Sequence, residues 1–331
     1  MEVRMARVLS GIKPTGHVHL GNYLGALQHW VAEQHDADAF HAVVDLHALT
    51  IEHDPAELRE RTLELARMLV AIGLDPDVTT LFVQSHVPEH AQLNWLMEAT
   101  VTYGELHRMI QFKEKSGGQE SVRAALLTYP ALMAADILLY DADRVPVGED
   151  QRQHLELTRD LAVRFNHHYG ETFVVPEAMV PTVGARIMDL QDPTSKMGKS
   201  SESGAGTVYL RDDPDDIAKK IRRAVTDTGT EVRYDVAEKP GVSNLLSILG
   251  AATGHTPQEA AAGYTRYGDL KAATADAVVE LLRPIQERYQ ELAADPGATD
   301  AILRKGADKA REVAGPTLSR AQRAIGLLPP S

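Results

Sequence analysis

The stretch that decides the fold runs from Ala6 to Gly25 and reads ARVLSGIKPTGHVHLGNYLG. Its first five residues predict a short strand, and glycines at 11, 16, 21 and 25 lie in the connection from that strand to a helix. Such a connection lets the backbone approach a ligand closely, and the amino end of the following helix attracts phosphate. A purely structural glycine turn would give the same pattern. The spacing matches neither the G-x-G-x-x-G fingerprint nor a P-loop.

Further strand-like runs over 40–45 and 79–84 alternate with amphipathic helices. One helix begins after Asp54, with Pro55 in its first turn, and ends at Gly73. This alternation predicts an α/β fold in which helices cover both faces of a parallel sheet. In the rest of the chain, we expect mostly helix over 104–166, with an extended break at 145–147, and then a strand and its exit over 179–190. Beyond about residue 190 we expect helices, with Pro284 kinking the long helical segment 274–293.

Composition excludes several classes of protein. The 331 residues are 44% hydrophobic and 24% charged, which argues against disorder and coiled coil. The absence of cysteine excludes disulfides, thiolate zinc sites and cysteine catalysis, and it fits a reducing, cytoplasmic setting. We expect no signal peptide before the first strand and no membrane span, because the most apolar stretch, 124–140, contains Thr128, Pro130 and Asp136. The net charge of −13 argues against nucleic-acid binding by the surface as a whole, but binding depends on local charge, so basic patches have to be considered separately.

A second motif, Lys196-Met-Gly-Lys-Ser200, lies far downstream of the glycine-rich turn. Its two lysines among glycine and serine form a flexible cationic loop that suits charge developing on a triphosphate, although a solvated lysine loop is the ordinary reading of such a run. The segment Pro14–Asn22, with His19-Leu-Gly-Asn, resembles the HIGH signature of class I aminoacyl-tRNA synthetases in an HxGN form. The downstream motif resembles KMSKS. Both signatures in the right order argue against coincidence.

The amino-acid specificity is suggested by the helix over 129–140. Tyr129, Met133, Asp136 and Tyr140 share one face of it, and a buried carboxylate there needs a partner. That partner is either a donor from the protein itself or a ligand N–H or O–H. The segment and the following VPVGEDQ at 145–151 closely resemble bacterial-type tryptophanyl-tRNA synthetases. The resemblance runs nearly end to end, through 104–116, 184–188 and 244–246.

The resemblance implies a Rossmann-like catalytic domain over 1–190 with a helical insertion near 104–166. A smaller all-helical, tRNA-binding domain would cover 191–331, carry the KMSKS-like loop at its start and pack its last helix back on the catalytic domain. It also implies a tryptophan–tRNA ligase that forms tryptophanyl-adenylate from L-tryptophan and ATP and transfers it to tRNA(Trp). Mg²⁺ would bind with ATP and not to the protein alone. A cytoplasmic homodimer bridged by tRNA is implied as well.

Site residues carried over from the resemblance fall into three groups. Tryptophan would contact Asp136 through the indole N–H, with Leu9, His47, Met133, Val145 and Val147 around the ring and Tyr129 and Gln151 at the ammonium. ATP would be surrounded by Lys13, Pro14, Thr15, Gly21, Asn22, Gly148, Glu149, Asp150, Ile187 and the loop residues Lys196, Met197, Gly198, Lys199 and Ser200. The catalytic groups would be His19, Lys115, Lys196 and Lys199, which stabilise charge in the transition state.

Three positions depart from the family pattern: Lys13 stands where relatives commonly carry Gln, Leu9 where many carry Phe, and Gly198 where KMSKS has Ser. We hypothesise that Lys13 adds a cation near the phosphates or the tryptophan carboxylate and so lowers the Mg²⁺ requirement. Gly198 keeps both lysines, so activity should survive. Leu9 would loosen one wall of the indole pocket.

Histidines and basic runs have ordinary interpretations too. His47 is as well explained by a satisfied loop histidine, and the pairs His86/His90 and His167/His168 are expected at the surface without a metal. Two basic runs suit tRNA phosphates: one over 304–323, with six basic and two acidic residues, and one at Lys219, Lys220, Arg222 and Arg223.

Three alternatives to a tryptophanyl enzyme remain open from the sequence. A tyrosyl-tRNA synthetase shares the fold and both signatures. A small nucleotidyltransferase shares an HxGH-like turn, but the helical C-terminal half argues against it. A non-catalytic paralogue that senses tryptophan or binds RNA is disfavoured by the intact His19, Asp136, Lys196 and Lys199.

Overall fold

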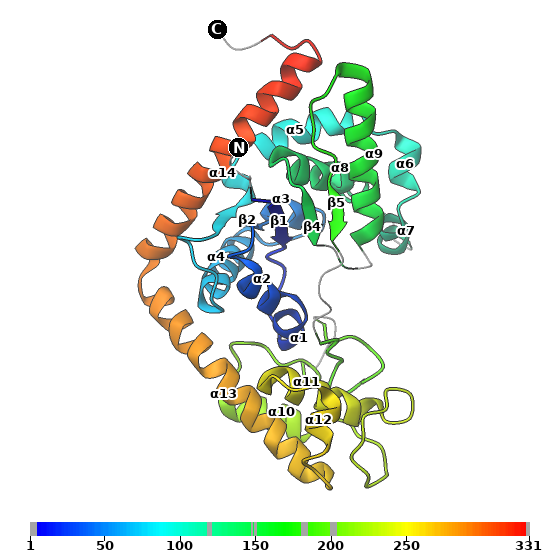
Figure 1. The fold of residues 1–331 in the computed structure, drawn as a ribbon, viewed down its shortest axis with the longest axis vertical. Helices are drawn as coiled ribbons and strands as arrows, with labels where there is room; N and C mark the ends of the chain where they lie inside the picture. Colours follow the sequence, from blue (N-terminus) through cyan, green and yellow to red (C-terminus); the bar gives the residue numbers. More distant parts are fainter. Residues whose placement is uncertain are drawn as a thin grey trace.

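The computed structural model describes residues 5–117, 121–146, 148, 151–179, 185–198 and 204–328. A five-stranded parallel sheet forms its centre, in the order β3-β2-β1-β4-β5 (Figure 1). The strands are β1 Arg7–Ile12, β2 Asp38–Val43, β3 Thr80–Val83, β4 Arg144–Pro146 and β5 Glu177–Met179. The sheet confirms the predicted Rossmann-like α/β fold. Of the predicted site residues, Val147, Glu149, Asp150, Lys199 and Ser200 lie outside the described residues.

Helices make up most of the remaining described chain. Those that precede or connect the strands are α1 Leu20–Asn22, the π-helix η1 Tyr23–Leu27, α2 Gln28–Glu33, α3 Asp45–Ala48, α4 Pro55–Ala71, the 3₁₀-helix η2 Gln84–His86, α5 Glu89–Glu98, α6 Tyr103–His107, α7 Ile110–Ser116, α8 Ala124–Leu139 and α9 Arg152–Tyr169. Those that follow the sheet are α10 Pro214–Arg222, α11 Pro240–Thr253, α12 Pro257–Ala261, α13 Tyr267–Ala294 and α14 Pro296–Ala324.

Helix α4 shows how local sequence determines an element. The Asp54 carboxylate accepts hydrogen bonds from the amides of Ala56 and Glu57, both at 2.9 Å, and satisfies two donors of the first turn. Gly73 follows the helix with φ +115°, a conformation that only glycine adopts without strain. Between these ends, Leu65 and Leu69 are buried in the core. The predicted start and end of this helix are therefore confirmed.

One sequence expectation differs in part from the structure. The strand expected over 179–190 begins earlier, as β5 Glu177–Met179, and within 185–190 the described chain makes only an isolated bridge from Met188 to Lys196. Residues 180–184 lie outside the described residues. Pro284 lies inside α13, and the kink expected there stays a prediction.

The two faces of the sheet are covered by separate apolar clusters. One joins Leu24 and Leu69 to Leu245 and Leu282, so α4 and the helices α11 and α13 share a core. The other surrounds Phe40 and packs α5, α8 and α9 against the opposite face. Within the described residues, no helix combines the length and apolarity that crossing a membrane requires.

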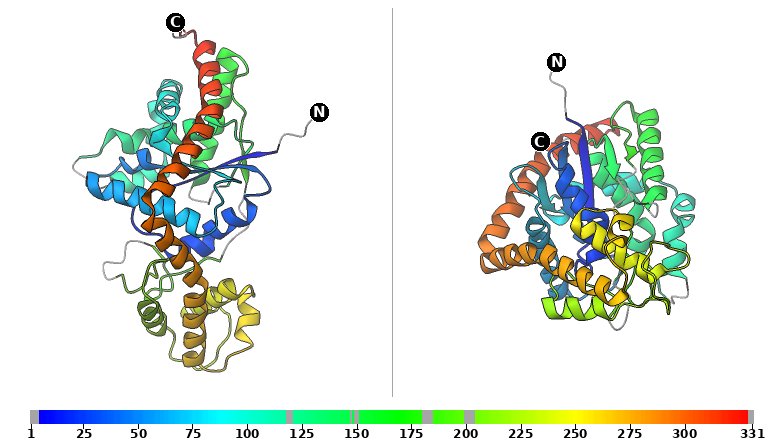
Figure 2. Two further views of the ribbon diagram at one scale, coloured as in Figure 1. Left: turned by 90° about the vertical axis from the view of Figure 1, so that its left-hand side faces the viewer. Right: turned by 60° about the horizontal axis from the view of Figure 1, so that its bottom comes forward.

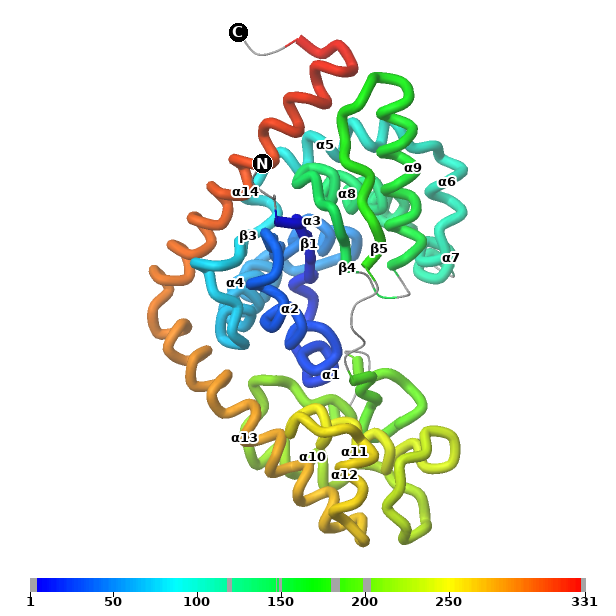
Figure 3. The backbone as a smooth tube through the Cα atoms, in the orientation of Figure 1, coloured from blue at the N-terminus to red at the C-terminus, as the bar shows by residue number. Residues whose placement is uncertain are grey.

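Helix α14 lies along β3, the edge strand of the sheet. The two C-terminal helices run from the small helical region, α10 to α12, up one side of the molecule to the sheet (Figures 2 and 3). At the contact, a Cβ on Gly306 would lie 1.8 Å from the backbone oxygen of Leu81, so no side chain fits there. The helix backbone thus approaches the strand backbone directly and covers an edge that could otherwise pair with another chain. The division into domains at residue 190 stays a prediction.

Candidate active site

A cavity of about 560 Å³ opens where β1, β2 and β4 end. Crevices at the carboxyl ends of parallel strands are the usual ligand sites of open α/β sheets. Every described residue predicted to contact tryptophan lines this cavity, together with three predicted to contact ATP and the predicted catalytic residue Lys115. Its lining is Leu9, Ser10, Gly11, Ile12, Lys13, Asn22, Trp30, Ala42, Val44, His47, Lys115, Tyr129, Met133, Asp136, Ile137, Val145, Pro146, Gly148 and Gln151.

The HxGN segment forms the start of α1. The Nδ1 atom of His19 accepts a hydrogen bond from the amide of Asn22, and the Asn22 side-chain oxygen accepts one from the amide of His19, both at 3.2 Å. This reciprocal cap uses Nδ1 as an acceptor, so the neutral ring carries its proton on Nε2. The cap therefore fixes both the position of the buried His19 ring and the nitrogen that can donate to a ligand.

The two signatures lie against each other. A Cβ on Gly21 would stand 3.3 Å from the Cβ of Met197, which leaves no room for a larger residue without a shift. The Met197 side chain is buried, and its amide donates to the carbonyl of Ile187 at 3.1 Å. The hydroxyl of Thr207 donates to the carbonyl of Gly198 at 2.8 Å. The start of the lysine loop is thereby anchored beside the HxGN turn.

Beyond this anchor, several predicted ATP residues do not line the cavity. Lys196 is exposed, and the side chain of Ile187 is buried in the core, so only its backbone is available at this point. Pro14 and Thr15 belong to the turn that leads into α1, and Gly21 lies in α1 itself. Their roles toward ATP stay predictions.

Asp136, on the wall of the cavity, accepts three hydrogen bonds from other side chains. Its Oδ1 atom accepts from Gln84 Nε2 and His90 Nδ1, each at 2.7 Å, and its Oδ2 atom accepts from His47 Nε2 at 2.8 Å. Burial alone would raise the pKa of Asp136, but the hydrogen bonds from the two histidines hold that pKa well below its usual value. The carboxylate is therefore ionised and has protein partners, the first of the two alternatives that the sequence left open, while it still faces the cavity.

Other groups on the cavity wall are also held in place. His47 lies in α3, not in a loop, and its ring contacts that of Tyr129 edge to face. The Tyr129 hydroxyl is 2.7 Å from His154 Nε2. Gln151 lies at the start of α9, where it lines the cavity. The polar groups predicted for the ammonium and the ring thus come from three different helices.

The opposite end of the cavity is cationic. Lys13 and Lys115 both line it. Burial of the Lys13 ammonium, followed by the charge of Lys115, lowers the pKa of Lys13 from its usual value, although the residue as a whole is exposed. Two lysines that repel each other across a cavity favour an anion between them. Within the described residues there is no cluster of three or more His, Asp or Glu side chains that could hold a metal ion.

One sequence expectation was wrong: His90 is not at the surface. Its side chain is completely buried between Asp136 and Tyr140, whereas His86, His167 and His168 are exposed as expected. The sequence held a signal, because His90 shares the inward face of α5 with Leu93 and Met97 at helical spacing. Gln84, Ser10 and Trp30 were also missed.

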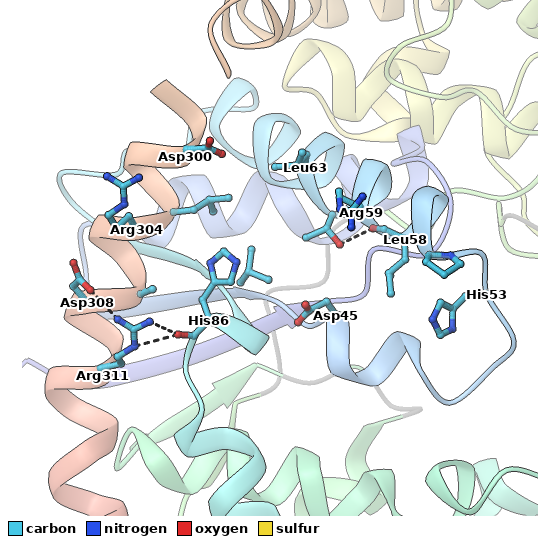
Figure 4. A pocket seen from close by; sticks show the side chains of 15 residues that line it. Asp45, His53, Leu58, Arg59, Leu63, His86, Asp300, Arg304, Asp308 and Arg311 are labelled. Atoms are coloured by element: carbon cyan, nitrogen blue, oxygen red, sulfur yellow. Dashed lines mark hydrogen bonds and ion pairs between the residues drawn. The ribbon is translucent and has the colours of Figure 1, made fainter. Parts of the chain in front are cut away.

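A second cavity, of about 620 Å³, lies between α4 and α14. Figure 4 shows its charged rim, with Arg59 on one side and Arg304 on the other. None of the residues predicted to bind tryptophan or ATP lines it. Its rim carries equal numbers of arginine and aspartate side chains, so it has no clear preference for an anion.

Comparisons with known proteins identify the family of the chain. The family model described as "tRNA synthetases class I (W and Y)" matches residues 1–283. The chain is 60% identical to tryptophan–tRNA ligase 1 of Streptomyces coelicolor over 98% of both chains, and 56% identical to the tryptophan–tRNA ligase of Leifsonia xyli, again over 98% of both.

Solved structures give the same result. The structure of tryptophanyl-tRNA synthetase from Mycoplasma pneumoniae is similar with a TM-score of 0.90 at 40% identity, over 98% of both chains. The enzyme from Campylobacter jejuni, complexed with ADP and tryptophan, gives 0.84 at 32% identity, over 97% of this chain and all of that one. A tyrosyl-tRNA synthetase from Archaeoglobus fulgidus, at 22% identity, shares the fold alone. The chain therefore belongs to the bacterial tryptophanyl-tRNA synthetases, class I ligases that form aminoacyl-tRNA.

Proposed function

We propose that this cavity activates L-tryptophan with ATP and that the chain then transfers the tryptophanyl group to the 3′ end of tRNA(Trp). The observation that carries the proposal is the division of one cavity into an apolar end, where Asp136 is the single ionised acceptor among the described lining residues, and a cationic end with Lys13 and Lys115. The Campylobacter jejuni relative, complexed with ADP and tryptophan, supports it.

The tryptophan ring would occupy the apolar end. Leu9, Met133 and Val145 offer its walls, with Val147 carried over from the family pattern, and Oδ2 of Asp136 keeps an acceptor position for the indole N–H. A carboxylate oxygen accepts about two hydrogen bonds, and His47 uses one of those on Oδ2. Tyr129 and Gln151 would face the ammonium.

ATP would occupy the cationic end, with its phosphates near Lys13 and Lys115. Nε2 of His19 and the side chain of Asn22 belong to the adjoining helix start. Lys196 and Lys199 would bind the phosphates, and the 148–150 segment and Ile187 would surround the nucleoside. Mg²⁺ would arrive on the ATP oxygens, since it gives up its water reluctantly, and would neutralise phosphate charge there.

The reaction needs no nucleophile from the protein. A carboxylate oxygen of tryptophan attacks the α-phosphorus, the bond to the bridging oxygen breaks, and pyrophosphate leaves with the bonding pair. A ribose hydroxyl at the tRNA 3′ end then attacks the activated carbonyl and AMP leaves. Holding two reactants in line and stabilising charge on the phosphates can supply most of the acceleration, so His19, Lys115, Lys196 and Lys199 are the groups proposed to act.

A cytoplasmic homodimer that binds tRNA(Trp) completes the proposal. Lys219, Arg222 and Arg223 are exposed on and beside α10 and have no side-chain partner among the described residues, which suits contact with a phosphate backbone.

Tryptophan-dependent ATP–pyrophosphate exchange tests the activation step, with tyrosine and phenylalanine as controls. We expect exchange with tryptophan alone, and its loss in Asp136→Ala. A folded protein that binds tryptophan but exchanges with no amino acid would contradict the proposal.

The role of Lys13 has a separate test. Lys13→Gln removes one cation from the phosphate end of the cavity, so we expect exchange in this variant to require more Mg²⁺. An unchanged Mg²⁺ titration would show that Lys13 does not help Mg²⁺ to neutralise the phosphate charge.

A further inference from the structure

A buried pair of side chains, His90 and Tyr140, lies behind Asp136 and has no part in the steps above. Neither side chain has any exposed surface. His90 Nδ1 is 2.7 Å from Asp136 Oδ1, and His90 Nε2 is 2.8 Å from the Tyr140 hydroxyl. Both rings also pack on Phe82, at centroid distances of 5.8 and 5.7 Å. The pair therefore connects the interior of the second apolar cluster to the one acceptor of the ring pocket.

The hydrogen-bond directions follow from the charge of Asp136. An ionised carboxylate only accepts, so Nδ1 of His90 must carry a proton. In the neutral ring Nε2 then has a lone pair, which accepts from the Tyr140 hydroxyl. Burial also raises the pKa of Tyr140 well above its usual value, which keeps that hydroxyl protonated. Asp136 thus sets the tautomer of His90, and the Tyr140 hydroxyl satisfies Nε2 and holds the ring in place.

The acceptor positions of Asp136 are nearly all filled. Gln84 and His90 occupy both positions on Oδ1, and His47 occupies one on Oδ2. Gln84 is itself oriented, because its Oε1 accepts from the amide of Leu46 at 3.1 Å. One acceptor position is left, on Oδ2, and the carboxylate cannot rotate to offer another without breaking bonds to buried partners.

We propose that His90 and Tyr140 are positioning residues that make a ring N–H a requirement of the substrate. This inference rests on the proposed function of Asp136. Because the remaining acceptor is fixed and desolvated, a ring of the same shape that lacks the N–H leaves it unpaired and is rejected. Without the Tyr140 hydroxyl, Nε2 of His90 is left buried without its partner, so the ring can shift and loosen its hydrogen bond to the carboxylate.

The test compares tryptophan with β-(3-benzothienyl)alanine, in which sulfur replaces the ring N–H. The measured quantity is the ratio of kcat/KM for the two amino acids in pyrophosphate exchange. We expect His90→Gln to lower this ratio at least about 10-fold and Tyr140→Phe to lower it by several-fold, with KM for ATP unchanged. Phe82→Leu is the matched control, since it disturbs the packing of the same rings without removing a polar atom, and its ratio should stay that of the wild type.

The outcomes separate the inference from the proposed function. A wild-type enzyme that uses both amino acids equally would contradict the role of Asp136 itself. If the wild type discriminates and Asp136→Asn does not, the role of Asp136 stands. Unchanged ratios in His90→Gln and Tyr140→Phe would then overturn the inference, and so would an equal loss of activity toward both amino acids. Should His90→Gln fail to fold, Tyr140→Phe decides, because it removes one oxygen only.

Discussion

Helices α14 and α10 both carry runs of positive charge, but they differ in how many of these charges form ion pairs. On α14, three cations form ion pairs with distant carboxylates: Lys305 with Asp77 at 2.5 Å, Lys309 with Asp38 at 3.6 Å and Arg320 with Asp141 at 2.6 Å. Arg311 also donates to the carbonyl of His86. On and beside α10, Lys220 pairs with Asp212, but Lys219, Arg222 and Arg223 remain exposed.

The difference shows that a basic run in a sequence does not by itself mark a surface for nucleic acid. The partners of α14 precede or begin strands of the sheet, so its cations fasten the helix along the sheet. On and beside α10, only Lys220 forms an ion pair, and Lys219, Arg222 and Arg223 have no carboxylate partner among the described residues. We therefore expect changes in α14 to alter stability and changes in α10 to alter tRNA binding.

The largest effect should come from breaking the contact of α14 with β3. In Gly306→Ala the new methyl group would collide with the Leu81 carbonyl, so the free energy of unfolding should fall by about 3 kcal/mol or more in urea titrations. Gly268→Ala in α13 is the control, because its Cβ would meet nothing within 4 Å, and the higher helix propensity of alanine should leave it as stable as the wild type or slightly more so. Equal stabilities for the two variants would show that α14 does not lie as described.

The next effect concerns α10. Replacing Lys219, Arg222 and Arg223 together by Gln should raise KM for tRNA in aminoacylation about 10-fold or more and weaken its salt dependence, since fewer phosphates are neutralised. Pyrophosphate exchange should not change. The double variant Lys305→Gln, Lys309→Gln on α14 serves as the control, with KM for tRNA close to the wild type. The reverse pattern would place the tRNA on α14.

A smaller effect is expected at the far end of α14. Arg320 pairs with Asp141 and also donates to the carbonyl of Thr172 at 2.6 Å, but its side chain is 38% exposed, so solvent weakens the pair. Arg320→Met should lower the free energy of unfolding by about 1 kcal/mol, measured by denaturant titration. Arg323→Met, one turn on and exposed, should have no measurable effect. Identical losses would indicate a general charge effect on α14.

The smallest effect is a pH dependence. The hydrogen bond from Lys305 lowers the pKa of Asp77 below its usual 3.8. A carboxyl whose pKa is lower in the folded state contributes stability above its unfolded pKa and loses it as pH falls through the folded pKa. The Tm difference between the wild type and Lys305→Met should therefore be present at pH 6 and disappear once the pH has fallen through the lowered, folded-state pKa of Asp77. A difference that persists there would exclude this pair as its cause.

The sequence predicted much of the fold because the deciding signals are local. The glycine-rich turn after β1 and the cap and final glycine of α4 each lie within a few residues of the element they define. The strand expected over 179–190 was placed too late, because pairing with β4 already starts at Glu177.

The candidate site could be predicted only in part. Asp136 and its neighbours on α8 share a helical face, so their convergence on the cavity was visible from spacing. His90 and Gln84 reach the same carboxylate from other elements, and no spacing connects them to it. The paired cations of α14 were missed for the same reason, because their carboxylates lie far away in the sequence.

The position of Gly306 against Leu81 also bears on how the chain is made. All five strands leave the ribosome before α14 does, so the nascent sheet carries an uncovered β3 edge until synthesis is nearly complete. Open strand edges pair with other chains, and long proteins are most prone to this while they are still incomplete. A premature stop or a proteolytic cut between residues 201 and 295 would make that passing vulnerability permanent, even though it would leave both signatures and the tryptophan pocket in the chain.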